Sequence, residues 1–306
     1  MILIADSGST KTDWTLLHSA NPQFGHDVVA TFHTQGITPI HQSTADIRQI
    51  LEQELLHQLS TFHRGALFQS GGLATPLFQD LHVFFYGSGC TPALVPVMKR
   101  LLTEELSTKS VEVHSDLMAA ARALCGREEG IACILGTGAN SCLYDGEHIV
   151  QNTPALGYVL GDEGSGSVLG RRFLNAIFKN PELASLCDEF LGEYRITMAD
   201  VIQRVYREPM ANRYLASLSP FICQHLGHPA VRLLVVDNFR QFFRMNIVPY
   251  RRRDLPVNFV GSMAYYYEEQ LAEAAGMEGF KMGRIMQSPL EGLVSYHTMI
   301  KPNNEI

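Results

Sequence analysis

The sequence lacks paired cysteines and long apolar runs. Its six cysteines are scattered without a CxxC motif, which argues against a disulfide framework, a zinc site or an iron-sulfur cluster. No apolar stretch approaches the roughly 20 residues that cross a bilayer. The opening residues MILIAD reach a charge at Asp6, too early for the apolar region of a signal peptide. We therefore expect a cytoplasmic protein with no membrane partner.

The sequence also lacks a basic surface signature. It has 24 Lys and Arg against 31 Asp and Glu, giving a formal net charge of -7 and a pI near 5.9. Binding to a nucleic-acid backbone needs a basic face. The one basic run, 251–253, is short and is followed by Asp254, as in a solvated surface turn. No nucleic-acid partner is expected.

The composition is that of a folded chain with more than one core. Of its 306 residues, 46% are hydrophobic and 18% are charged. This length favours two domains, and the balance leaves no room for a long disordered region. We expect a first domain over 1–115, completed by 288–306, and a second domain over 116–287.

The apolar pattern predicts an α/β architecture with a repeated strand meander. Strand-like segments flank a glycine turn near the start of the chain, and 44–60 has the apolar spacing of a capped helix. Short buried strands are predicted at 83–87 and 111–115, each followed by a helical pattern. A second meander starts at 131, and its Gly138 lies 130 residues after Gly8, which forms a weak internal repeat.

The first turn, DSGSTKT at 6–12, is rich in groups that bind phosphate. Its glycine lets backbone N–H groups approach an anion, and Asp6 ends a buried strand, where it is placed to hold a hydrated Mg²⁺. An ordinary polar hairpin turn explains the same residues equally well. The side-chain donors of this turn are Ser9, Thr10, Lys11 and Thr12.

A second turn, GTGAN at 136–140, strengthens the phosphate interpretation, because a nucleotide can be gripped from two sides. The chain has no GxxxxGK[ST] motif, and strand rather than helix is predicted after each turn. A P-loop and a dinucleotide-binding fingerprint are therefore not supported.

Four segments together resemble one superfamily. DSGSTKTDW resembles the first phosphate motif of the actin, hexokinase and Hsp70 superfamily, ILGTGANS its second, and FVGSMA at 259–264 its adenosine motif, all in the expected order. GYVLGDEGSG at 157–166 resembles the N-acetylglucosamine kinase branch, which is grouped with the BadF/BadG/BcrA/BcrD ATPases. The resemblance implies an α/β protein of two actin-like (ribonuclease H-like) ATPase domains with a nucleotide cleft between them. The ATP contacts that it implies are Thr137 and Gly138 at the phosphates, and Ala216, Gly261 and Ser262 near the adenosine.

Asp116 is the candidate general base. It follows a predicted strand and begins a predicted helix, at the edge where the clefts of α/β sheets lie. A carboxylate there can accept the proton of a substrate hydroxyl. The same residue can equally act as the N-cap of the alanine-rich helix. Asp116 also matches the catalytic aspartate of the resembled family.

The sugar contacts are less completely defined. Asp162 and Glu163 form an acidic pair that could accept hydrogen bonds from hydroxyl groups or cap the following helix. The resemblance implies sugar contacts at Asn140, Gly157 and Asp162. At the remaining position Thr38 stands where the family commonly has asparagine, which leaves the identity of the sugar open.

These observations predict an ATP-dependent sugar kinase. With ATP and Mg²⁺ as cofactors, it would phosphorylate the primary (C6) hydroxyl of N-acetylglucosamine or a related amino sugar, with Asp116 as base. Two alternatives remain open: an ATPase that activates a partner protein, and a sugar or nucleotide sensor without catalysis. The dispersed cysteines count against the activating ATPase, and the presence of Asp116 counts against the non-catalytic sensor. The resemblance implies a homodimer.

Overall fold

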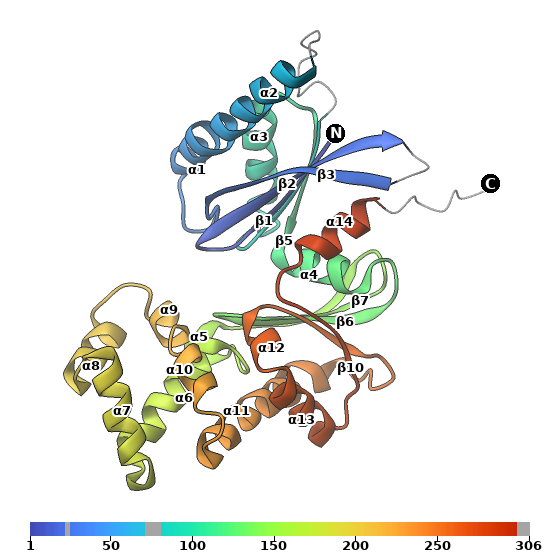
Figure 1. The fold of residues 1–306 in the computed structure, drawn as a ribbon. Coiled ribbons are helices and arrows are strands. Elements are labelled where there is room, and N and C mark those ends of the chain that lie inside the picture. Colours follow the sequence, from blue (N-terminus) through green and yellow to red (C-terminus); the bar gives the residue numbers. More distant parts are fainter. Residues whose placement is uncertain (22–24, 71–80, 299–306) are drawn as a thin grey trace. The chain divides into compact units, whose positions relative to one another are not determined.

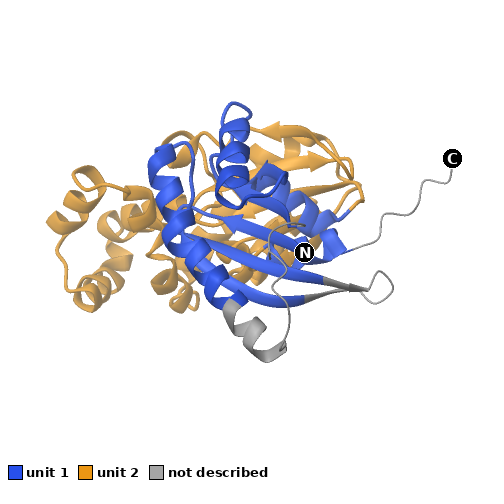
Figure 2. Ribbon diagram, turned by 90° about the horizontal axis from the view of Figure 1, so that it is seen from above, with its two compact units in different colours: residues 1–126, 289–306 blue, residues 127–288 orange. Residues whose placement is uncertain are grey.

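The computed structural model describes residues 1–21, 25–70 and 81–298 (Figure 1). The chain divides into two compact units, coloured separately in Figure 2. The first unit comprises Met1–Gly126 with Pro289–Ile306, and the second comprises Arg127–Ser288. Across the described ranges, no helix is long and apolar enough to cross a membrane.

A five-stranded mixed sheet forms the centre of the first unit, in the order β3-β2-β1-β4-β5. The first three strands form an antiparallel meander, and β4 and β5 run parallel to β1. Leu3 and Ala5 face one side of the sheet and Ile4 the other, so both faces are apolar. The strands are β1 (Ile2–Ser7), β2 (Lys11–Asn21), β3 (Gly25–Gln35), β4 (His82–Gly87) and β5 (Ser110–Ser115).

Helices cover both faces of this sheet (Figure 1). One face carries α1 (Thr44–Ile50), the π-helical turn η1 (Leu51–Leu56), α2 (His57–Ser70) and α3 (Val95–Glu105). The other carries α4 (Asp116–Cys125) and α14 (Leu290–Thr298). Ser43 caps α1 through a capping box with Asp46, which confirms one of the two caps expected for the 44–60 helix.

The second unit repeats the same sheet topology. Its order is β10-β9-β6-β7-β8, with an antiparallel meander from β6 to β8 and with β9 and β10 parallel to β6. The 130-residue offset between Gly8 and Gly138 is thus the offset between two equivalent hairpin turns. The strands are β6 (Gly130–Leu135), β7 (Ala139–Tyr144), β8 (Ile149–Thr153), β9 (Val257–Val260) and β10 (Met282–Met286).

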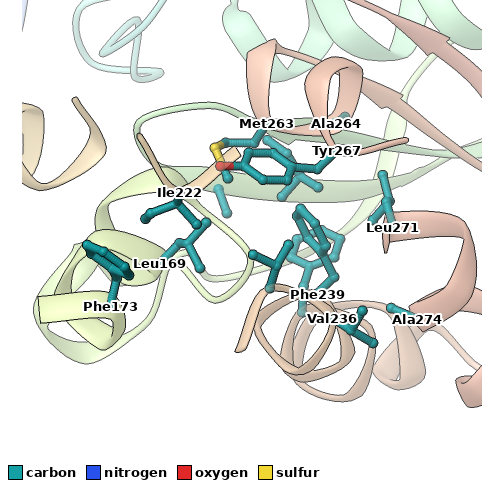
Figure 3. Close-up of a cluster of buried hydrophobic side chains, with 14 of the residues drawn as sticks. Leu169, Phe173, Ile222, Val236, Phe239, Met263, Ala264, Tyr267, Leu271 and Ala274 are labelled. Atoms are coloured by element: carbon teal, nitrogen blue, oxygen red, sulfur yellow. The ribbon is translucent and has the colours of Figure 1, made fainter. Parts of the chain in front are cut away.

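The helices of the second unit lie largely between β8 and β9. Their apolar faces form a large core with the sheet, part of which Figure 3 shows around Leu169, Phe239 and Tyr267. The helices are α5 (Gly157–Leu160), α6 (Gly166–Lys179), η2 (Pro181–Leu183), α7 (Ala184–Tyr194), α8 (Met198–Tyr206), α9 (Ala211–Ala216), α10 (Ser219–Gln224), α11 (Pro229–Phe242), η3 (Phe243–Ile247), η4 (Val248–Tyr250), α12 (Ser262–Tyr266) and α13 (Glu268–Glu278).

Two details of the fold were not predicted from the sequence. The division between the units falls after Gly126 rather than after residue 115, because Ala119 and Ala123 of α4 pack with Ile4 and Leu293 of the first unit. The helical segment after the 259–264 motif is split at Tyr267, whose backbone leaves the helical conformation between α12 and α13.

Candidate functional site

The first glycine turn joins β1 to β2 and displays three of its predicted donors. The N–H of Gly8 donates to the carbonyl of Lys11 at 3.0 Å and closes the turn. Ser9, Thr10 and Lys11 are all exposed at its tip. Their hydroxyls and ammonium group are therefore accessible to a phosphate ligand.

Thr12 does not share this exposure. Its side chain is buried, its Oγ1 lies 2.6 Å from Ser7 Oγ, and the hydroxyl donates to the carbonyl of Gln35 at 3.1 Å. The backbone N–H of Ile37 also donates to both hydroxyl oxygens. The expectation that Thr12 supplies a phosphate donor is therefore wrong: its hydroxyl joins the hairpin to the segment that follows β3.

Three carboxylates of the first unit influence one another at this hairpin. Asp6 and Asp13 are paired across β1 and β2, and Lys11 Nζ lies 2.7 Å from Asp13 Oδ2. Burial, followed by the negative charges of Asp13 and Asp116, raises the pKa of Asp6 to about 7. Asp6 is therefore a carboxyl group whose ionised form would gain from a nearby cation.

This donor set fits a hydrated Mg²⁺. Among the described residues, no three His, Cys, Asp or Glu side chains converge closely enough to form a coordination cage. Mg²⁺ commonly keeps several of its waters and uses only one or two protein carboxylates. That Asp6 holds a Mg²⁺ through its waters stays a prediction; burial raises the pKa of Asp6 most, and the nearby negative charges that such an ion would neutralise raise it further.

Asp116 is the first residue of α4 and does not cap it. Ser115 is the N-cap, and its hydroxyl accepts from the N–H of Met118. The Asp116 Oδ1 accepts from the N–H of Leu117 at 2.8 Å, and Ser88 also hydrogen-bonds to the carboxylate. Burial is the main reason that the pKa of Asp116 is raised. The capping explanation is therefore wrong, and the carboxylate is left for another role.

Thr38 packs against the neighbouring loop that contains Gly89. Its side chain is buried against Gly89, where an added Cβ would lie 3.1 Å from Thr38 Cγ2. Its N–H donates to Gln42 Oε1 at 2.7 Å. Within the described part of the chain, the Thr38 hydroxyl has no hydrogen-bond partner. The structure thus brings Thr38 to the YGSGC loop at 86–90, and its contact with a sugar stays a prediction.

The second glycine turn is tied to the start of α6. The N–H of Gly166 donates to the carbonyl of Gly136 at 2.8 Å, and the N–H of Ser167 donates to that of Thr137 at 3.2 Å. Thr137 itself is exposed. These two hydrogen bonds therefore fix the turn, with its exposed Thr137, to the start of α6.

Asp162 lies over this second turn. Its Oδ1 accepts from the N–H of Ala139 at 3.3 Å, and an added Cβ at Gly138 would lie 3.1 Å from its Oδ2. Asp162 has a left-handed backbone with φ 53°, and burial, followed by the charge of Glu163, raises its pKa. Its N–H donates to Ala155, close in sequence to Gly157. The structure thus joins Asp162 to the residue before Asn140 and to Ala155, two residues before Gly157, and the sugar contacts of these three residues stay predictions.

Glu163 is held by a residue that the sequence analysis missed. Asn246, buried in η3, donates from Nδ2 to Glu163 Oε2 at 3.1 Å. Ser165, not the acidic pair, caps α6, so the capping explanation is wrong here too. An asparagine within an otherwise apolar helical stretch was the available signal, because buried amides are found with hydrogen-bond partners.

The adenosine motif adjoins the second turn through close backbone packing. Gly261 has φ 121°, and an added Cβ there would collide with the carbonyl of Leu135. Ser262 follows, exposed at the start of α12. An added Cβ at Gly166 would lie 3.2 Å from Ala216 Cβ and 3.3 Å from Met263 Sδ. Of the predicted ATP contacts of this unit, Ala216 therefore lies beside Gly166, and Met263, which follows Ser262, packs there too.

The three tyrosines after this motif differ in exposure. Tyr267 is buried, and its hydroxyl donates to the carbonyl of Ser219 at 2.7 Å (Figure 3). Tyr265 and Tyr266 are exposed and pack edge to face, with ring centroids 5.4 Å apart. Only Tyr265 and Tyr266 are thus placed to contact a ligand.

No family model matches the sequence, and no curated protein matches it. Solved structures do match this chain. A "Putative N-acetylglucosamine Kinase" from Porphyromonas gingivalis is 45% identical, with a TM-score of 0.86 and full coverage of both chains. One of the same description from Chromobacterium violaceum is 20% identical over 96% of this chain and 98% of its own, with a TM-score of 0.68. A ROK hexokinase from Thermus thermophilus is 15% identical over 96% and 97%, with a TM-score of 0.51.

The two more distant structures show the fold, which is the two-domain α/β fold of the actin-like ATPases. The first covers the whole chain at an identity that establishes common descent. This protein therefore belongs to the family of the Porphyromonas gingivalis protein described as a putative N-acetylglucosamine kinase.

Proposed function

We propose that the protein is an ATP-dependent kinase that phosphorylates the primary (C6) hydroxyl of N-acetylglucosamine or a related amino sugar. The observation that carries this proposal is the Asp116 carboxylate. It is half-buried, it is not the N-cap of α4, and it is located in the same unit as the phosphate hairpin and Asp6. The Porphyromonas gingivalis relative supports the same class of reaction by its description.

Each group has a distinct part in the proposed reaction. Asp116 accepts the proton of the sugar hydroxyl as its oxygen bonds to the γ-phosphorus, and the bond from that phosphorus to the β–γ bridging oxygen breaks to release ADP. Asp6 would hold Mg²⁺ through its waters, and the ion would supply positive charge near the phosphates. The phosphate contacts are Ser9, Thr10 and Lys11 on the first unit and Thr137 and Gly138 on the second.

Both units take part in this proposal. The adenosine would contact Ala216, Gly261 and Ser262, all in the second unit. The sugar would contact Asn140, Gly157 and Asp162 there, and Thr38 in the first unit. The homodimer implied by the sequence resemblance stays a prediction, which light scattering on the purified protein checks directly.

The test is a coupled ADP-release assay with N-acetylglucosamine, N-acetylmuramic acid, glucosamine and glucose. We expect sugar-dependent ATP turnover with at least one amino sugar, and none without sugar. If all four fail to raise turnover, the kinase proposal is wrong. Sugar binding without turnover would favour the sensor, and sugar-independent ATP hydrolysis would favour the ATPase that activates a partner.

A further inference from the structure

The amide of Asn140 is fixed in one orientation by its neighbours. Its Oδ1 accepts from the backbone N–H of Ser141 at 2.9 Å and from Asn152 Nδ2 at 2.9 Å. Both lone pairs of this oxygen are therefore engaged. Among the residues that the structure describes, no acceptor is paired with Asn140 Nδ2.

The orientation of Asn152 is fixed independently. Asn152 lies on β8, opposite Cys142 of β7. Its Nδ2 also lies 2.7 Å from the carbonyl oxygen of Ser141 and 3.1 Å from that of Thr153, so that its two hydrogens are shared among three acceptors. Carbonyl oxygens can only accept hydrogen bonds. The amino group of Asn152 must face them, and Asn140 must in turn present its oxygen to Asn152.

We propose that Asn152 is a positioning residue that makes Asn140 a pure hydrogen-bond donor toward the substrate. This inference rests on the proposed sugar-kinase function and defines the polarity of its sugar site. The substrate group opposite Asn140 is then an acceptor, a hydroxyl or carbonyl oxygen. The Asp162 carboxylate, which accepts from the N–H of Ala139, the residue before Asn140, would accept from a donor group of the same substrate.

A donor and an acceptor side by side select for a polyhydroxylated or acylated ligand. Mispairing an acceptor with an acceptor costs more than losing the hydrogen bond, because both groups remain desolvated and repel each other. Asparagine and aspartate have nearly the same shape. Asn140→Asp therefore replaces the amino donor by an acceptor oxygen without changing the volume of the side chain.

The first experiment compares Asn140→Asp with Asn140→Ala, using the sugar that wild type phosphorylates best. We expect Asn140→Ala to raise the sugar KM by about 10-fold and Asn140→Asp by clearly more, with the ATP KM unchanged in both. If Asn140→Asp binds sugar as well as or better than Asn140→Ala, the oxygen rather than the amino group faces the ligand. That result overturns the inference.

The second experiment tests whether Asn152 acts through Asn140. Asn152→Ala should raise the sugar KM by about 3-fold or more with little change in kcat, and should add nothing in an Asn140→Ala background. Gln151→Ala is the matched control, because Gln151 is the exposed neighbour on β8. An equal effect of Asn152→Ala in both backgrounds overturns the positioning role.

A third measurement needs no turnover. In ¹⁵N NMR spectra, with assignments from the alanine variants, the side-chain amide of Asn152 should exchange more slowly than that of Asn140, because the hydrogens of the exposed Asn152 amide are engaged by three acceptors. A protected Asn140 amide overturns the inference even if the protein phosphorylates no sugar. Conversely, fast Asn140 exchange with no turnover of any sugar removes the proposed function but leaves the amide polarity established.

Discussion

Asn246 Nδ2 donates a hydrogen bond to Glu163 Oε2 at 3.1 Å, although the two residues are 83 positions apart. The carbonyl of Asn246 accepts from Thr153 Oγ1 at 3.0 Å, so Asn246 joins the acidic loop to β8. Asn246 lies in the π-helical turn η3, a kind of distortion that is frequent at functional sites. The buried amide of Asn246 therefore orients the acidic loop that contains Glu163.

Replacing Asn246 should damage the sugar site selectively. We expect Asn246→Ala to raise the sugar KM by about 10-fold, because Glu163 loses the donor that orients its carboxylate. The ATP KM should stay within about twofold, since no ATP contact is altered. Asn175→Ala, on α6 of the same unit, serves as control. Equal losses for sugar and ATP would show that Asn246 supports the unit as a whole.

Removing the carboxylate of Asp116 should abolish transfer and spare nucleotide binding. We expect Asp116→Ala and Asp116→Asn to lower kcat by about 100-fold or more, with ATP affinity retained by calorimetry. Wild-type kcat should also fall as the pH drops through the raised pKa of Asp116, because only the ionised base accepts a proton. Retained turnover in either variant would remove Asp116 from the base role.

The raised pKa of Asp116 also predicts that its ionised carboxylate lowers the stability of the fold, at the same pH values at which it supports activity. The unfolded state ionises Asp116 at a lower pH than the folded state, so burial of the ionised group disfavours folding once the pH exceeds the ordinary value of 3.8. Asp116→Asn should therefore raise the Tm at neutral pH and lose this advantage near pH 3. A lower Tm at neutral pH would contradict the assignment of burial as the main cause.

Mg²⁺ binding should depend on pH near neutrality. The pKa of Asp6 is about 7, so at pH 6 a proton competes with the cation and at pH 8 it does not. We expect the Mg²⁺-induced rise in Tm to grow between pH 6 and pH 8 and to disappear in Asp6→Asn. Asp188→Asn, at an exposed position on α7, is the control. An unchanged response in Asp6→Asn would exclude Asp6 from the metal site.

The two glycines Gly261 and Gly276 should respond oppositely to alanine. Gly261→Ala forces a side chain into a left-handed conformation and onto the carbonyl of Leu135, which should cost about 2 to 4 kcal/mol of unfolding free energy. Gly276, exposed in α13 with open space around it, should gain about 0.5 to 1 kcal/mol. Denaturant titrations measure both. A neutral Gly261→Ala would show that the adenosine motif tolerates a side chain.

Much of the fold was predictable because its signals are local. Strand alternation gives β4 and β5 close to their observed bounds, and helical spacing predicts that a helix follows each of them. Strand β10 was missed, because its MGRIM segment is short and has no buried residue to mark it. The end of the first unit was misplaced at residue 115, because the packing of α4 against Leu293 joins segments far apart in the sequence.

The sequence by itself determined the two glycine hairpins, their 130-residue offset and the residue types available for phosphate and hydroxyl chemistry. Only the tertiary structure decided which of those groups remain available. It buries the Thr12 hydroxyl, assigns helix capping to Ser115 and Ser165, and places Asn246 and Asn152 against Glu163 and Asn140. The physical reason is that hydrogen-bond partners and burial arise between segments distant in the chain, and these decide whether a polar group is free to act.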